Sequence, residues 1–93
     1  MSTDRAETAE ITVYWRPGCV FCMKLWLKLR LTGTPYRPVN IWRDPDAAAY
    51  VRSVANGNET VPTVRVHAPE GPERALVNPS LAQVRRALAE VDR

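Results

Sequence analysis

The sequence predicts one α/β domain in which a four-stranded mixed sheet is flanked by helices, with elements in the order β-α-β-α-β-β-α. Three observations lead to this prediction: short runs of β-branched and aromatic residues, helix-forming stretches between them, and glycines and prolines at the junctions. A chain of 93 residues is too short for a second hydrophobic core. We therefore assign residues 11–93 to a single domain and the polar residues 1–10 to a flexible N-terminal tail.

The N-terminal part of the domain is predicted to be a strand, a helix and a strand. Residues 11–15 are rich in β-branched and aromatic side chains, and residues 36–41 form a second such run, in which Pro38 indicates an edge strand. Between them, residues 19–32 are rich in Leu, Lys, Met and Arg, which favour a helix. Gly33 and Pro35 follow where that helix should end. This order predicts a right-handed parallel crossover.

The C-terminal part adds two helices and a hairpin. Asp44 and Pro45 predict a helix start, and this helix should run to about Ala55, where residues 56–58 tolerate positive φ. Residues 63–67 and 74–77 are predicted antiparallel strands, because only a short turn over 68–73 joins them. Residues 78–80 precede a last helix, with Ser80 and Gln83 as a capping box. The core face of this helix should carry the apolar residues at helical spacing: Leu81, Val84, Leu88 and Val91.

Composition and charge argue against several classes of function. The net charge is +3, but the basic residues are scattered and form no dense run, so we expect no nucleic-acid partner. There is no run of about 18 apolar residues, so we expect no membrane span. The first ten residues are polar and include acids, which is unlike a signal peptide, and we expect a cytoplasmic monomer.

The two cysteines, Cys19 and Cys22, are the candidate catalytic residues. A Cys-x-x-Cys motif between a strand and a helix is typical of thiol–disulfide exchange. Two cysteines and the distant His67 do not supply a tetrahedral zinc site, so we predict no metal site in this chain. Two alternatives stay open: a half set of zinc ligands completed by another chain, and a buried pair that packs as small hydrophobic residues.

The start of a helix is the place where this chemistry is favoured. Attack on a disulfide requires a thiolate, and the free N–H groups of a helix N-terminus stabilise an anion there. Arg16 could add a positive charge close to Cys19. Cys22 shares a helical stripe with Leu25 and Leu29, the expected core face. We therefore expect Cys19 to be the exposed attacking thiol and Cys22 the buried resolving thiol.

A different face of the same helix has no assigned role. Leu27 and Leu31 do not lie on the stripe of Leu25 and Leu29. They either pack beneath a neighbouring helix or form a small exposed patch, and exposed leucines are common enough that the sequence does not decide between these.

The chain resembles the glutaredoxins, and more narrowly the mycoredoxins of actinobacteria, over residues 10–92. The motifs that carry the resemblance are Cys19-Val20-Phe21-Cys22, Thr60-Val61-Pro62 and Asn78-Pro79-Ser80. The resemblance implies a thioredoxin/glutaredoxin fold with a cis Val61–Pro62 bond that faces the cysteines. It also implies that the backbone of Val61 pairs with an extended thiol substrate.

The resemblance further implies the substrate, a mixed disulfide between a protein cysteine and mycothiol, a sugar thiol used in place of glutathione. Mycothiol would be a co-substrate, with no bound cofactor, and a separate NADPH-dependent reductase would recycle it. Glutathione-dependent glutaredoxins usually carry a glycine pair and an acid before the last helix, whereas this chain has Val77-Asn78-Pro79-Ser80. Asn78 and Ser80 would bind sugar hydroxyls or only cap the helix. The expected substrate-binding residues are Arg16, Phe21, Thr60, Val61, Pro62, Asn78 and Ser80.

Three other functions remain open at this point, and one of them is a redox-sensing module that binds partner proteins. NrdH-redoxins, thioredoxin-like electron donors to proteins such as ribonucleotide reductase, also combine a Cys-x-x-Cys motif with a similar proline. They typically carry a Trp-Ser-Gly-Phe-Arg-Pro-like stretch near the last helix, which this chain lacks. Some glutaredoxin-like proteins bind an iron–sulfur cluster and are not enzymes. Most of those have a single cysteine at the site, so Cys22 argues against this function.

Overall fold

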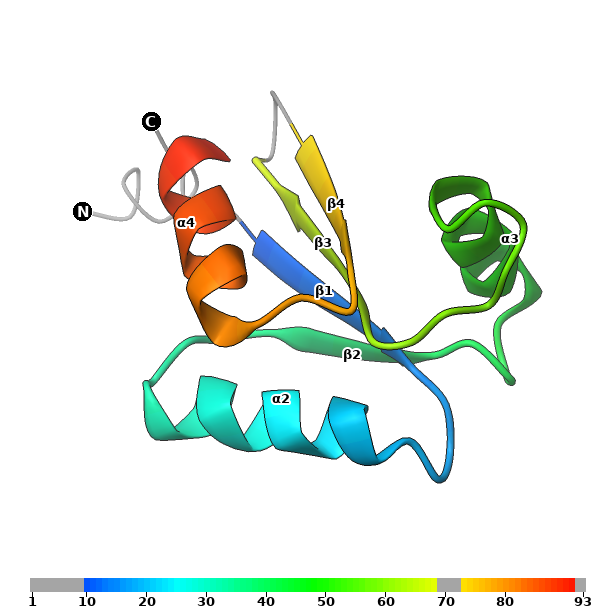
Figure 1. Ribbon diagram of the computed structural model, residues 1–93, viewed down its shortest axis with the longest axis horizontal. Coiled ribbons are helices and arrows are strands. Elements are labelled where there is room, and N and C mark those ends of the chain that lie inside the picture. The colour runs from blue at the N-terminus through cyan, green and yellow to red at the C-terminus, as the bar shows by residue number, and fades with distance from the viewer. Residues whose placement is uncertain (1–9, 69–72, 92–93) are drawn as a thin grey trace.

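Seven elements follow one another in the predicted order. The computed structural model describes residues 10–68 and 73–91, and its elements are β1 (Glu10–Trp15), α2 (Val20–Leu31), β2 (Arg37–Asn40), α3 (Pro45–Val54), β3 (Thr63–His67), β4 (Glu73–Val77) and α4 (Leu81–Val91) (Figure 1). Most of the predicted turn over residues 68–73, and most of the predicted N-terminal tail, lie outside the described residues. Within these residues no helix is long and apolar enough to cross a bilayer.

The four strands form one mixed sheet in the order β2-β1-β3-β4. Strands β1 and β2 are parallel and β3 and β4 are antiparallel, as predicted. Strand β3 is also antiparallel to β1, a pairing that the sequence did not predict. Pro38 lies in β2 at the edge of the sheet. No described strand lies on the outer side of β2 to accept the backbone hydrogen bond that proline is unable to donate. One boundary differs from the prediction: Glu10, assigned to the tail, pairs with His67 and so begins β1.

The helices cover both faces of the sheet and create two apolar clusters. Figure 1 shows α2 and α4 on one side of the strands and α3 on the other. Because side chains alternate along a strand, Val13 points into the cluster with α2 and α4, and Tyr14 points into the cluster with α3. Both cysteines belong to this second cluster, whose buried members are Tyr14, Cys19, Cys22, Ile41, Ala47, Ala48, Val51 and Val61.

The predicted helix starts are confirmed by their hydrogen bonds. The Asp44 carboxylate accepts a bond from the backbone N–H of Ala47 at 3.1 Å. In the capping box of α4, the Ser80 hydroxyl accepts from the N–H of Gln83 at 3.2 Å, and the Gln83 amide oxygen accepts from the N–H of Ser80 at 2.8 Å. On the core face of α4, Val84 and Val91 are buried, whereas Leu81 and Leu88 are only partly buried; Ala87, which the apolar pattern missed, is buried between them.

Candidate active site

Cys19 and Cys22 form a disulfide at the N-terminus of α2. Cys19 is the N-cap residue, with an extended backbone, and its Sγ accepts a hydrogen bond from the N–H of Cys22 at 3.1 Å. The sulfur therefore occupies the position in which a capping serine or aspartate oxygen satisfies a free N–H of the first turn. The same N–H is placed to stabilise a thiolate on Cys19 after reduction.

The burial of the two cysteines differs in part from the prediction. Cys22 is fully buried on the stripe of Leu25 and Leu29, as expected. Cys19 was expected to be exposed, but only 9% of its surface is accessible. The reason is that its sulfur is bonded to Cys22 and lies against Val61, in the cluster that α3 closes from the other side. Of the two cysteines, Cys19 nevertheless remains the one with any surface exposed.

The loop before β3 lies against the disulfide. The Val61–Pro62 peptide bond is cis, as the resemblance implies, and the carbonyl oxygen of Val61 is 3.8 Å from the Sγ of Cys19. Thr63, whose side chain is completely buried, donates a hydrogen bond from its hydroxyl to the carbonyl of Thr60 at 2.7 Å. This bond closes the loop around Val61 and Pro62. This role of Thr63 was not predicted, although a threonine at the first position of a strand is a residue type that commonly bonds back to a preceding turn.

The turn before α4 is tied to the same loop. The backbone N–H of Asn78 donates to the carbonyl of Pro62 at 2.8 Å, and Asn78 has a φ of 51°. The side chains of Asn78 and Ser80 are exposed, and the cap that the Ser80 hydroxyl forms on α4 is present. The three motifs of the sequence, separated by about 40 and then about 15 residues, are thus brought together through Val61 and Pro62.

The remaining predicted residues border the cysteines on the outside. The carbonyl of Arg16 accepts a hydrogen bond from the N–H of Cys19 at 3.3 Å, and the Arg16 side chain is exposed. Phe21, between the cysteines, is 61% exposed, and the ammonium of Lys24 lies 5.9 Å from the centre of its ring. Lys24 was not predicted as part of the site, and its position three residues after Phe21 on a helix is the signal that could have indicated it.

On the α3 side, charged and aromatic residues continue from the cysteine cluster. The rings of Tyr14 and Tyr50 are 5.2 Å apart, and the Arg65 guanidinium lies 5.5 Å from the Tyr50 ring. Arg65 also forms an ion pair with Glu73 at 2.8 Å. Burial, together with the negative charge of Glu73, raises the pKa of Tyr50, and the hydrogen bond to Glu73 raises the pKa of Arg65. Neither side chain is therefore placed to act as a proton acceptor near neutral pH.

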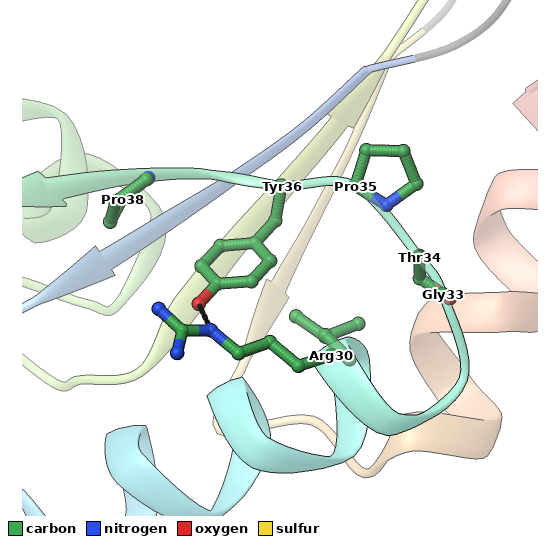
Figure 2. A pocket seen from close by; sticks show the side chains of 7 residues that line it. Arg30, Gly33, Thr34, Pro35, Tyr36 and Pro38 are labelled. Atoms are coloured by element: carbon green, nitrogen blue, oxygen red, sulfur yellow. Dashed lines mark hydrogen bonds between the residues drawn. The ribbon is translucent and has the colours of Figure 1, made fainter.

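Two further features bear on what the site could hold. Among residues 10–68 and 73–91, no three His, Cys, Asp or Glu side chains are grouped so as to hold a metal ion. A pocket of about 500 Å³ lies at the opposite end of α2, lined by residues between Leu29 and Pro38 (Figure 2). It includes none of the predicted site residues. This pocket is therefore separate from the disulfide.

Comparison with known proteins gives a consistent result. Residues 11–68 match the family model described as Glutaredoxin. The chain is 34% identical over 84 residues to a Mycobacterium tuberculosis protein named as a glutaredoxin, covering 90% of this chain and 95% of that protein. It is 39% identical over 57 residues to mycoredoxin 1 of Corynebacterium glutamicum, covering 61% of this chain and 70% of that protein.

The fold has a solved counterpart. A crystal structure of a thioredoxin-like protein aligns with 85% of this chain and 99% of its own, with a TM-score of 0.63 and 20% identity. The predicted mixed sheet with flanking helices is thus a thioredoxin-like fold, and the resemblance to glutaredoxins is confirmed by the family match and the two relatives.

Proposed function

This chain belongs to the glutaredoxin family of thiol–disulfide oxidoreductases, and from that premise we propose that it reduces mixed disulfides between mycothiol and protein cysteines. Cys19 is the attacking thiol and Cys22 the resolving thiol in this proposal. The co-substrate is mycothiol, and a separate NADPH-dependent reductase returns it to the thiol form. The protein acts in the cytoplasm, where such thiol pools are kept reduced.

One observation carries the assignment of the two cysteines: the Cys22 N–H donates to the Sγ of Cys19 at the N-cap of α2. Thiolate attack needs a sulfur that is stabilised as an anion and can reach a substrate. The Sγ of Cys19 accepts that hydrogen bond and 9% of the Cys19 surface is accessible, whereas Cys22 is fully buried one turn further along the helix. Cys22 is in turn close enough to close the ring, because the two sulfurs form a disulfide in this structure.

The proposed reaction has two routes after a shared first step. The Cys19 thiolate attacks the mycothiol sulfur of the mixed disulfide, the client sulfur leaves as a thiolate that takes a proton from solvent, and Cys19 is left linked to mycothiol. In the first route, the thiolate of a second mycothiol attacks the mycothiol sulfur, which gives mycothiol disulfide and restores the Cys19 thiolate. In the second route, Cys22 loses its proton to solvent and attacks the sulfur of Cys19, mycothiol leaves as a thiolate that takes up a proton, and the Cys19–Cys22 disulfide forms.

The preference for mycothiol is supported by the relatives and by the turn before α4. One relative is named mycoredoxin 1. The turn has Asn78 and Ser80 where glutathione-dependent glutaredoxins usually carry an acid and a glycine pair, and both side chains are exposed. The N–H of Asn78 joins this turn to Pro62, next to the carbonyl of Val61 that faces Cys19. A thiol held by the Val61 backbone would therefore extend toward the side chains of Asn78 and Ser80.

The test is the turnover of a mycothiolated protein in two coupled assays. One assay contains mycothiol, its NADPH-dependent reductase and NADPH, and the other contains glutathione and glutathione reductase. We expect NADPH consumption in the first and little in the second. Activity in neither assay, together with fast reduction by thioredoxin reductase, would contradict the mycothiol proposal and favour a thioredoxin-like electron donor.

Substitutions of the cysteines test their separate roles in the same assay. Cys19→Ser should lose turnover, by a factor of about 1,000 or more, since the remaining thiol, Cys22, is fully buried and cannot reach the mixed disulfide. Cys22→Ser should retain reduction of the mycothiolated protein by the first route and lose reduction of ordinary protein disulfides. A Cys19→Ser protein with full activity would contradict the assignment.

A further inference from the structure

Helix α2 is apolar on two opposite faces. The inner face carries Cys22, Leu25 and Leu29, which are buried. The outer face carries four exposed residues: Val20 (59%), Met23 (57%), Leu27 (58%) and Leu31 (76%). At about 100° per residue, these four lie within an arc of about 80°, opposite the buried residues. We call these four residues the outer stripe.

The described chain does not cover the outer stripe. The apolar face of a helix is normally packed against other elements. Here the sheet and α4 pack on the inner side of α2, and Figure 1 shows no element among the described residues on its outer side. Of the two alternatives that the sequence left open for Leu27 and Leu31, the exposed patch is therefore correct.

The borders of the outer stripe are basic. On the helix, Lys24 and Lys28 lie along one side of the stripe and Arg30 lies along the other, and α2 contains no acidic residue. The Nε of Arg30 donates to the Tyr36 hydroxyl at 3.2 Å, and this bond holds the guanidinium beside α2, next to Tyr36 (Figure 2). The complementary surface is an apolar strip bordered by carboxylates. A second copy of this chain would instead bring two basic borders together.

The outer stripe is continuous with the thiol site. It begins at Val20, between the two cysteines, next to the exposed ring of Phe21. A helix of 12 residues extends it for about 18 Å. A strip of this size suits a small interface, which is typical of transient redox encounters.

From these observations we propose that the outer stripe docks a partner protein through a helix whose apolar residues are bordered by Asp and Glu. The proposal rests on the proposed thiol-exchange function, because the docked partner is the protein whose mixed disulfide with mycothiol reaches Cys19. Docking along α2 would lower the KM for a protein substrate and leave the reaction of small disulfides unchanged.

The experiment measures binding without requiring catalysis. Two fluorescent helical peptides have the same leucine stripe, one bordered by Glu and the other by Lys, and neither contains cysteine. Fluorescence anisotropy should show at least tenfold tighter binding of the Glu peptide. The double variant Leu27→Gln with Leu31→Gln should weaken this binding at least tenfold, since glutamine keeps the helix but removes the apolar contact. Trp42→Gln, another exposed apolar residue, is the matched control and should bind as wild type.

A charge variant keeps the test decisive if the double variant fails to fold. Lys28→Glu should weaken Glu-peptide binding and reduce its dependence on salt, whereas Arg86→Glu, at an exposed position on α4, should do neither. Equal binding of the two peptides by wild type would overturn the proposal. It would also be overturned if the stripe variants instead abolished self-association in sedimentation velocity, or binding to phosphatidylserine vesicles.

A separate assay distinguishes the docking proposal from the proposed function. Turnover of 2-hydroxyethyl disulfide should be the same in wild type and in the Leu27→Gln, Leu31→Gln variant. If wild type fails to turn over this disulfide or the mycothiolated protein, the proposed function is wrong, while peptide binding still decides the docking proposal.

Discussion

The hydrogen bond between Thr63 and Thr60 should hold the loop beside the disulfide, and Thr63→Val is the change that tests it. Valine keeps the branched shape of the side chain but removes the hydroxyl that donates to the Thr60 carbonyl at 2.7 Å. Loss of the bond costs about 1 kcal/mol, and a carbonyl left partly buried without its partner adds to this. Because Thr63 is completely buried, water cannot replace the hydroxyl there. We expect a total destabilisation of about 1–2 kcal/mol.

The assay is thermal unfolding by circular dichroism of the oxidised protein. For a domain of this size, the expected loss lowers the melting temperature by about 5–15 °C. Thr12→Val is the matched control, because Thr12 is a nearly buried strand residue whose hydroxyl forms no side-chain hydrogen bond with the residues described. It should change stability by less than about 0.5 kcal/mol. Equal melting temperatures for the two variants would refute the reasoning. Because the loop lies beside the disulfide, Thr63→Val should also change the KM for the mycothiolated protein, and an unchanged KM would refute the reasoning as well.

Three further predictions concern the scaffold. Asp44→Ala removes the cap on the Ala47 N–H and should cost about 1 kcal/mol in denaturant unfolding, whereas Asp44→Ser should restore most of it. Leu29→Ala, at a site with no exposed surface, should cost about 2–5 kcal/mol in the same experiment, and a loss below about 1 kcal/mol would contradict the packing. Since burial and Glu73 raise the pKa of Tyr50, the phenolate absorbance that Tyr50→Phe removes should develop above pH 10. The unfolded chain loses this proton first, so the contribution of Tyr50 to stability is complete below pH 10 and is lost as pH rises through its folded pKa.

The parts of the fold that depend on neighbouring residues were predictable from the sequence. Helix starts are determined by side chains within three or four residues, so Asp44 and Ser80 were identified as caps. Pro38 indicated the edge strand because proline cannot donate to a neighbouring strand. Cys22 was placed in the core by helical spacing alone.

The parts that depend on distant segments were not predictable in this way. The burial of Cys19 comes from Val61, 42 residues away, and from the small side chains of α3, and no local pattern at residue 19 contains that information. The hydrogen bond from Asn78 to Pro62 joins two segments that only the completed sheet brings together. For a related reason, the exposure of the outer stripe on α2 was not predictable. A leucine pattern does not indicate whether another element will pack against it.

The geometry of the turn before α4 also has a consequence for protein engineering. Asn78 already adopts a positive φ, the conformation that glycine accepts most easily, while its N–H is bonded to the Pro62 carbonyl. Glycine at this position would keep both the backbone path and that bond. If the proposed function is correct, side chains in residues 77–80 are therefore the place to redesign thiol preference, with the disulfide and its supporting loop left in place.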